Sequence, residues 1–204
     1  MEHLIQAIDC LTPSEVEKVL DILSSKEWHP TTVFGGRPQG KDVSECIIDK
    51  SIRSNTRYCP SDDSEEAIIM HEGMNAALLR YRDELFNVSP HYSGYPIPGT
   101  YRTNCYREQI QVLKYEHEEY YNWHTDQATD KNVNEINRTI SIVLYLECAD
   151  EGGRTIFPSR AYKPKPGQAL IFPSNWCYPH SAEPVRKGRK IAAVTWYHSN
   201  YNYD

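Results

Sequence analysis

The chain has 204 residues, of which 39% are hydrophobic, and this size suits a single domain with one continuous core over residues 1–204. The formal net charge of -6 argues against a broad basic surface, so no nucleic-acid partner is expected. No segment approaches the roughly 18 consecutive apolar residues of a membrane span, so no membrane partner is expected either.

The first predicted element is a helix that begins near Thr12. Thr12, followed by Pro13 and Glu15, forms the pattern of a capping box with proline in the first turn. The apolar residues that follow recur on one helical face: Val16, Val19, Leu20 and Leu23. We expect this helix to brace a sheet.

The next stretch predicts less regular structure. Residues 31–48 include Gly35, Gly36 and Gly40, which indicate a loop that leads into a short strand. Residues 52–58 are polar, which suits either the edge of a sheet or a wall of a substrate groove.

A second, longer helix is predicted from about residue 64 to residue 86, where breakers are rare. Its apolar stripe has helical spacing: Ile69, Met70, Met74, Ala77, Leu78, Tyr81 and Leu85. Residues 88–101 are rich in proline and glycine and predict an ordered loop. The first part of the domain, about residues 1–100, is therefore expected to give helical support.

Strand-like segments dominate after about residue 105. Four segments are rich in β-branched and aromatic residues and are bounded by Gly, Pro or Asn: residues 105–115, 138–147, 168–174 and 190–199. Several strands after two helices predict an α+β, mainly β, fold in which helices cover one side of a sandwich or barrel.

Two histidines and one aspartate form a candidate metal site. His124 and Asp126 are two positions apart, so in an extended segment they lie on one face, and His180 would join them from a distant strand. Two imidazoles and one carboxylate make the facial triad of non-haem iron(II) oxygenases, which leaves coordination positions open. The pattern predicts a catalytic iron site.

Lys190 adds a fixed positive charge near this site. A lysine suits a dicarboxylate whose inner end chelates iron and whose far carboxylate needs a cationic partner, as in 2-oxoglutarate. Tyr115 and Thr155 offer hydroxyl groups to the same far carboxylate. On the last predicted strand, Lys190 shares one face with Trp196 and His198, which lie too far along the strand to touch the same end of the cofactor.

The six cysteines form no Cys-x-x-Cys pair, which is typical of free thiols in a reducing compartment. The N-terminus has neither the basic nor the apolar segment of a signal peptide. A cytoplasmic location is therefore expected.

Around these residues the sequence resembles the prolyl 4-hydroxylase branch of the 2-oxoglutarate/iron(II) dioxygenases. Residues 111–126, QVLKYEHEEYYNWHTD, are similar to the family's pattern of two tyrosines, here Tyr115 and Tyr121, before the first ligand histidine. Further similar stretches are GGRTIFPS at residues 152–159, KPKPGQALIFPS at 163–174 and HSAEPVRKGRKIAAVTW at 180–196. One departure is Glu118, which stands where many relatives have glycine.

The resemblance implies a double-stranded β-helix, a jelly-roll form, with the catalytic core over about residues 105–200. It implies hydroxylation of prolyl residues in a proline-containing peptide or protein, with iron(II), 2-oxoglutarate and dioxygen, and with ascorbate as a candidate reductant. It also implies substrate contacts from four residues: Tyr121, Arg138, Trp196 and His198.

Two alternatives remain open at this point. One is a related oxygenase that acts on another residue or on a small metabolite. The other is a non-catalytic β-barrel binding protein with a structural metal in the same triad. Lys190, which a structural zinc site would not require, favours the enzyme.

Overall fold

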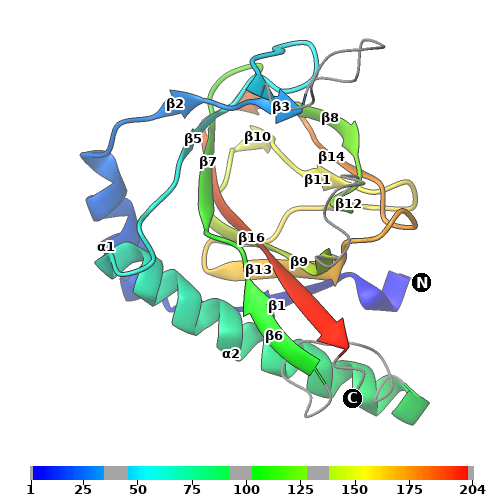
Figure 1. Cartoon of the computed structure of the whole chain (residues 1–204). Coiled ribbons are helices and arrows are strands. Elements are labelled where there is room, and N and C mark those ends of the chain that lie inside the picture. The colour runs from blue at the N-terminus through cyan, green and yellow to red at the C-terminus, as the bar shows by residue number, and fades with distance from the viewer. Residues whose placement is uncertain (1, 35–45, 92–102, 128–137, 202–204) are drawn as a thin grey trace.

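The computed structural model describes residues 2–34, 46–91, 103–127 and 138–201 (Figure 1). A short 3-10 helix, Glu2–Leu4, precedes strand β1 (Gln6–Asp9), helix α1 (Pro13–Ser24) and strands β2 (His29–Pro30), β3 (Val33–Phe34), β4 (Cys46–Ile47) and β5 (Thr56–Tyr58). Helix α2 (Glu65–Val88) then leads to strands β6 (Thr103–Arg107), β7 (Gln111–Tyr115) and β8 (Tyr121–His124). The remaining strands are β9 (Arg138–Glu147), β10 (Glu151–Gly152), β11 (Thr155–Ile156), β12 (Ala161–Tyr162), β13 (Gln168–Pro173), β14 (His180–Ala182), β15 (Val185–Lys187) and β16 (Lys190–Tyr201).

The two helices form where the sequence predicts them. Thr12 caps α1, and Glu15 completes a reciprocal capping box with it. Ser64 caps α2 by accepting a hydrogen bond from the backbone N–H of Ala67. Both helices bury their apolar stripes, although Leu20 and Ile69 are only partly buried.

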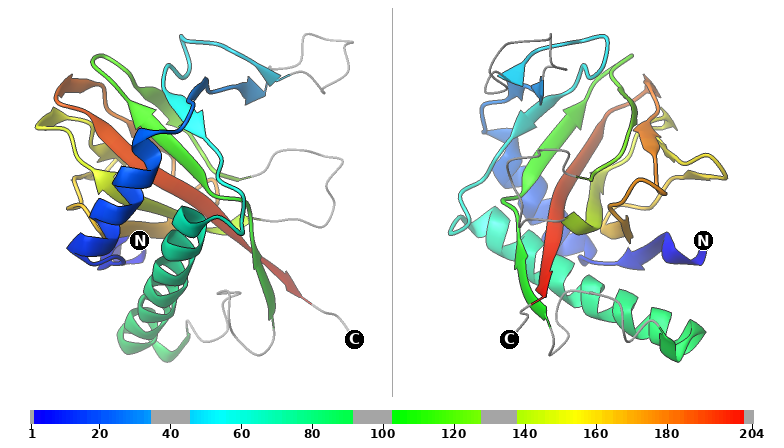
Figure 2. Two further views of the ribbon diagram at one scale, coloured as in Figure 1. Left: turned by 90° about the vertical axis from the view of Figure 1, so that its left-hand side faces the viewer. Right: turned by 45° about the vertical axis from the view of Figure 1, so that its right-hand side comes forward.

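The strands form two facing sheets. The large sheet has the order β1-β13-β9-β16-β7-β5-β2, with β6 also paired to β16, and the smaller sheet has the order β12-β11-β14-β8. Two small pairs, β10 with β15 and β3 with β4, complete the described sheets. Both helices lie on one side of the large sheet and the smaller sheet lies on the other (Figures 1 and 2).

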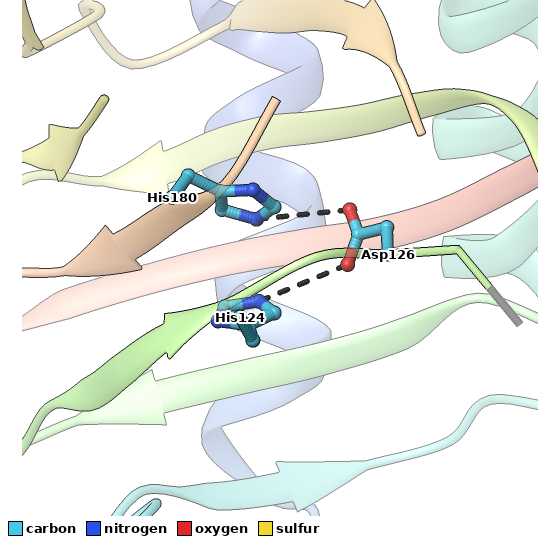
Figure 3. A group of neighbouring side chains, drawn as sticks. All are labelled: His124, Asp126 and His180. Atoms are coloured by element: carbon cyan, nitrogen blue, oxygen red, sulfur yellow. Dashed lines mark ion pairs between the residues drawn. The ribbon is translucent and has the colours of Figure 1, made fainter. Parts of the chain in front are cut away.

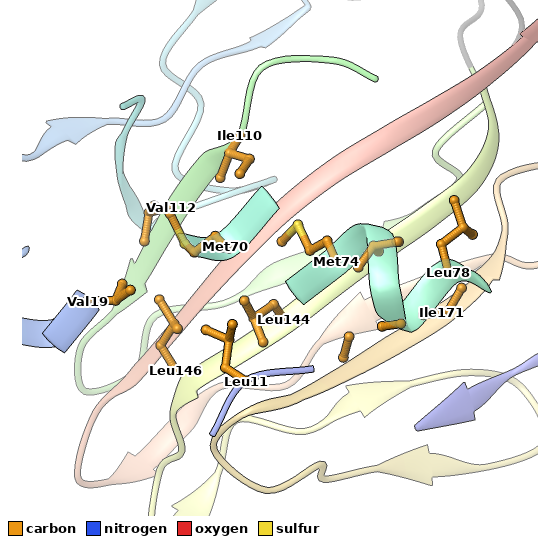
Figure 4. Close-up of a cluster of buried hydrophobic side chains, with 14 of the residues drawn as sticks. Leu11, Val19, Met70, Met74, Leu78, Ile110, Val112, Leu144, Leu146 and Ile171 are labelled. Atoms are coloured by element: carbon orange, nitrogen blue, oxygen red, sulfur yellow. The ribbon is translucent and has the colours of Figure 1, made fainter. Parts of the chain in front are cut away.

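Strand alternation divides the large sheet into two faces with different partners. On β9, Ile142 and Leu144 belong to the core that packs against the helices. Figure 4 shows Leu144 in this core. The alternate residue Tyr145 packs instead with Phe157, which follows β11 of the smaller sheet. The face between the two sheets is therefore the one on which a site can be built.

The structure corrects some sequence predictions at the level of elements. The predicted strand 105–115 is two strands, β6 and β7, because residues 108–110 leave the extended path, where the N–H of Glu108 bonds the carbonyl of Trp196. Residues 52–58 yield β5, which lies between β7 and β2 rather than at a sheet edge. Strand β1 was not predicted, because a four-residue strand carries little periodic signal.

Other predictions fall partly outside the described residues. Gly35, Gly36 and Gly40 of the predicted loop, and most of the predicted loop at residues 88–101, lie outside them. Within the described part of the chain, neither helix is long and apolar enough to cross a membrane. The single-domain boundaries and the cytoplasmic location stay predictions.

Candidate metal centre and active site

Paired strands of the smaller sheet bring the three predicted metal ligands together. His124 ends β8, His180 begins β14, and the two residues are direct partners in the antiparallel register. Asp126 follows two residues after His124, and its carboxylate faces both imidazoles (Figure 3). Its carboxylate oxygens lie 3.7 Å from His124 Nε2 and 3.7 Å from His180 Nε2. One ligand atom from each residue can be chosen so that all lie within 4.8 Å of one another.

Backbone carbonyls orient both imidazoles. His124 Nδ1 lies 2.8 Å from the carbonyl oxygen of Asn122, and His180 Nδ1 lies 3.1 Å from that of Tyr178. Because a carbonyl oxygen only accepts, each Nδ1 must carry a proton, and in the neutral imidazole each Nε2 then keeps its lone pair. Both lone pairs belong to the nitrogens that face Asp126, which is the arrangement a metal ion requires.

Burial and neighbouring groups together keep His124 and Asp126 in their metal-binding protonation states. Burial, reinforced by the nearby His180, lowers the pKa of His124 to about 4. Burial by itself would raise the pKa of Asp126, but His180, His124 and the Ser141 hydroxyl together bring it below its usual value. At neutral pH the site therefore offers a neutral His124 and an ionised carboxylate.

Aromatic rings fix the walls of the cluster. The Tyr121 ring stacks on His124 with centroids 3.7 Å apart. The rings of Phe157 and Phe172 lie 5.4 Å and 4.8 Å from the His180 ring. These contacts restrict the two imidazoles to one orientation each.

The predicted cofactor-binding residues lie between the two sheets, Lys190 and Tyr115 on the large sheet and Thr155 on the smaller one. Lys190 pairs with Tyr115 in the register of β16 and β7, and its Nζ lies 5.1 Å from the centre of the Tyr115 ring. Thr155, on the smaller sheet, is hydrogen-bonded to the hydroxyl of Tyr145, whose ring centre is 4.9 Å from Lys190 Nζ. Tyr145 was missed at the sequence level, although strand alternation from Ser141 would have placed it on this face.

Lys190 is a buried cation without a buried anion. Its side chain is 3% exposed, and no carboxylate of the described residues forms an ion pair with it. Burial lowers the pKa of Lys190 to about 8. Gly153 lies against its aliphatic stem, because a Cβ at that position would be 3.7 Å from Lys190 Cδ. An anionic ligand would restore the charge balance of this pocket.

The predicted substrate residues Arg138, Trp196 and His198 also lie together, around a carboxylate that the sequence did not reveal. Arg138 donates to both oxygens of Glu108 at 2.5 Å and 2.6 Å and covers the Trp196 ring at 3.7 Å. His198 Nε2 is 2.8 Å from Glu108 Oε1. Glu108 reaches this position because the extended strand is interrupted between β6 and β7. No local sequence pattern predicts this interruption.

A second buried cation, also missed at the sequence level, lies beside Tyr121. Arg53 pairs with Tyr121 in an isolated bridge, and its guanidinium carbon is 4.5 Å from the Tyr121 ring centre. Its Nε donates to Asn55 Oδ1 at 2.8 Å. Residues 52–58 thus contribute to the wall of the site, as one of the two readings of this segment predicted.

Glu118 takes an unusual backbone conformation. Its φ is 63°, which makes it the one non-glycine residue with positive φ in the described part of the chain. Its carboxylate receives Arg186 Nη1 at 2.5 Å and 2.6 Å, and its N–H donates to the carbonyl of Val185 at 2.8 Å. Glu118 therefore keeps the positive-φ turn that favours glycine, and its exposed ion pair with Arg186 spans the turn.

The comparisons with known proteins agree with this geometry. Residues 110–198 match the model of the 2OG-Fe(II) oxygenase superfamily. The "Putative prolyl 4-hydroxylase" of Acanthamoeba polyphaga mimivirus is 35% identical over 107 residues, which cover 44% of this chain and 44% of that protein. "Prolyl 4-hydroxylase 2" of Arabidopsis thaliana is 32% identical over 125 residues, which cover 45% and 41%. The matched part spans less than half the length of these relatives.

Solved structures share the fold over nearly the whole chain. A viral collagen prolyl hydroxylase from Paramecium bursaria Chlorella virus-1, in complex with 2OG, has a TM-score of 0.64 at 20% identity and covers 96% of each chain. A prolyl hydroxylase from Trichoplax adhaerens, in complex with a hypoxia inducible factor peptide fragment, has a TM-score of 0.65 at 16% identity and covers 96% of this chain and 84% of the other. The predicted jelly-roll fold with supporting N-terminal helices is confirmed.

Proposed function

We propose that this chain, which carries a 2OG-Fe(II) oxygenase domain over residues 110–198, is a 2-oxoglutarate- and iron(II)-dependent dioxygenase that hydroxylates prolyl residues in a peptide or protein. The observation that carries the proposal is that two features lie together in the space between the large sheet and the smaller sheet. One is the cluster of His124, Asp126 and His180, and the other is the buried, uncompensated Lys190.

The donor atoms fit iron(II). Two imidazole nitrogens with free lone pairs and one carboxylate are the donor set of non-haem iron oxygenases. When bound, iron(II) with 2-oxoglutarate and dioxygen supplies the oxidising chemistry that inserts one oxygen atom into a C–H bond and leaves the other in succinate. Ascorbate belongs to the proposal only as the external reductant that keeps the iron ferrous.

Lys190 would bind the far carboxylate of 2-oxoglutarate. Its ammonium is held on the inner face of β16, with the rings of Tyr115 and Tyr145 on either side of the charge. Burial raises the pKa of the Tyr115 phenol to about 12, so this hydroxyl stays protonated and able to donate to a carboxylate. The pocket excludes water from the carboxylate and thereby strengthens its attraction to Lys190.

The opposite end of the site supplies groups for a peptide. Arg138 of β9 stacks there on Trp196 of β16, and Glu108 joins Arg138 to His198, which follows Trp196 by two residues on β16. The Arg138 side chain is 23% exposed, so part of it remains accessible to a peptide. Planar aromatic and guanidinium groups suit the ring and carbonyl groups of a prolyl residue. Their role is to hold the target C–H bond beside the metal.

The first test is an anaerobic titration of the full chain with iron(II), with and without 2-oxoglutarate. We expect a visible charge-transfer band when both are present, because 2-oxoglutarate chelates the iron, and we expect Lys190→Ala to weaken the band by lowering 2-oxoglutarate affinity. His124→Ala, Asp126→Ala and His180→Ala should abolish turnover of 2-oxoglutarate. Full turnover in any of these three variants would contradict the assignment.

Substrate class needs a separate measurement. Proline-containing peptides should gain one oxygen atom on a prolyl residue, as seen by tandem mass spectrometry, in the presence of iron(II) and 2-oxoglutarate. Peptides in which alanine replaces proline are the matched control. Oxidation of another residue or of a small metabolite would support the related oxygenase instead, and binding of iron without the charge-transfer band would support a binding protein.

A further inference from the structure

A segment that precedes α2 lies against β8, the strand that ends at the ligand His124. Arg53 of this segment is the bridge partner of Tyr121, and the N–H of Asn122 donates to the carbonyl of Ile52 at 2.9 Å. The carbonyl of the same Asn122 lies 2.8 Å from His124 Nδ1. The segment therefore supports the piece of backbone that orients this imidazole.

A second connection to the ligand runs through side chains. The guanidinium carbon of Arg53 is 4.5 Å from the centre of the Tyr121 ring. That ring stacks on His124 with centroids 3.7 Å apart and an angle of 14° between the planes. A guanidinium over an aromatic face is attracted by the ring, so Arg53 favours one position of Tyr121. The stacked ring in turn restricts the imidazole.

A buried network fixes Arg53 itself. Its Nε donates to Asn55 Oδ1 at 2.8 Å, and the Thr31 hydroxyl donates to the Asn55 carbonyl at 2.7 Å. Arg53 is 9% exposed, and Asn55 and Thr31 are each 1% exposed. Because buried polar side chains in a satisfied network are rigid, the guanidinium is held in one place.

The charge of Arg53 cannot be what supports the metal site. A guanidinium and a bound metal ion are both positive, so their electrostatic interaction opposes metal binding. A favourable contribution of Arg53 therefore has to come from its geometry. Arginine suits this geometry because its planar group can stack on a ring while Nε donates a hydrogen bond, whereas the ammonium of lysine is a single point charge.

We propose that Arg53, oriented by Asn55, is a positioning residue that holds the ligand His124 through the Tyr121 ring. Arg53 and Asn55 lie outside residues 110–198, so part of the support for this ligand comes from beyond the matched oxygenase domain. The inference rests on the proposed function, since His124 is a ligand of the proposed iron site, but the orientation of the imidazole can be measured without metal.

Two readouts on the full chain test the inference. Proton NMR of the metal-free chain gives the shifts of the His124 ring protons, which the stacked Tyr121 ring perturbs and which His124→Ala assigns by loss of their signals. Calorimetry with Mn(II), in place of iron(II), gives the metal affinity. In Arg53→Lys, which keeps the charge, we expect the His124 signals to move toward those of an unstacked histidine. We also expect the Mn(II) affinity to fall about tenfold, as when a residue that supports a ligand is changed.

Three further variants separate positioning from general stability. Asn55→Ala should change both readouts in the same direction as Arg53→Lys, because it releases the guanidinium without altering the charge. In a Tyr121→Ala background, Arg53→Lys should lower the Mn(II) affinity no further, because Arg53 acts through Tyr121. Tyr58→Phe, on the nearby strand β5, removes a hydroxyl that donates to Glu66 Oε1 at 2.8 Å and should change neither readout.

Wild-type shifts of the His124 ring protons in Arg53→Lys would overturn the inference, whatever the Mn(II) affinity. An equal loss of affinity from Arg53→Lys in the wild-type and Tyr121→Ala backgrounds would also overturn it, because Arg53 would then act by another route. Failure of the proposed function would look different. The ring-proton shifts would still respond to Arg53→Lys, while the wild-type chain would bind no divalent metal or consume no 2-oxoglutarate.

Discussion

At the scale of single residues, the protonation of Lys190 should control 2-oxoglutarate binding. Burial lowers the pKa of Lys190 to about 8, so below this pH the empty site holds a cation and above it a neutral amine. A dicarboxylate binds the cation, so the apparent affinity should be full below about pH 8 and fall about tenfold for each pH unit above it. Calorimetry on the Mn(II)-loaded protein, under anaerobic conditions, measures this profile.

The matched variant is Lys190→Arg, because a guanidinium stays charged over the whole range. Whatever its affinity for 2-oxoglutarate, the pH profile of this variant should be flat above about pH 8, where the wild-type affinity falls. Burial raises the pKa of the neighbouring phenols Tyr115 and Tyr145, so neither phenol loses its proton in the pH range where Lys190 does. A flat wild-type profile across about pH 7 to pH 10 would show that Lys190 does not carry the charge that binds the ligand.

At the scale of elements, Gly73 sets how closely α2 approaches the segment that joins β1 to α1. A Cβ on Gly73 would lie 2.5 Å from Leu11 Cδ2 and 2.8 Å from the carbonyl oxygen of Cys10. Gly73→Ala should therefore lower the free energy of unfolding by about 1 to 3 kcal/mol, although alanine is normally the better helix former. Urea unfolding followed by circular dichroism measures the change.

Ala76→Gly is the control on the same helix, since residue 76 is exposed. It should cost about 1 kcal/mol through helix propensity alone. If Gly73→Ala instead stabilised the protein by a similar amount, the helix would have room to move, and the close approach would not be a constraint.

At the scale of the whole molecule, metal and 2-oxoglutarate should stabilise the fold together. The ligand triad lies on or beside the smaller sheet and Lys190 lies on the large sheet, so the two ligands connect both layers. With Mn(II) bound, 2-oxoglutarate at a hundred times its dissociation constant should add about 2.7 kcal/mol. Thermal unfolding in chelator, in Mn(II), and in Mn(II) with 2-oxoglutarate measures each contribution.

Succinate is the control ligand, because it has both carboxylates but lacks the oxo group that chelates metal. It should add less than 2-oxoglutarate when Mn(II) is present. An equal rise in melting temperature with 2-oxoglutarate in chelator would place its binding site away from the metal cluster.

Local sequence determined much of this protein. Thr12 and Glu15 specify the start of α1 because a capping box needs only neighbours along the chain. The strand predicted at residues 138–147 has the bounds of β9, because β-branched and aromatic residues there favour one extended run. The motif around His124, Asp126 and His180 indicated the site, because its ligand types are diagnostic whatever the fold.

Only the tertiary structure decided how those residues are supported. Ser141 can reach Asp126 because β9 runs behind the metal site, and Glu108 meets Arg138 because the extended strand is interrupted between β6 and β7. Arg53 joins Tyr121 from another part of the sequence. Periodicity and capping are local interactions, whereas these contacts depend on how distant strands align, and sequence spacing alone does not fix that alignment.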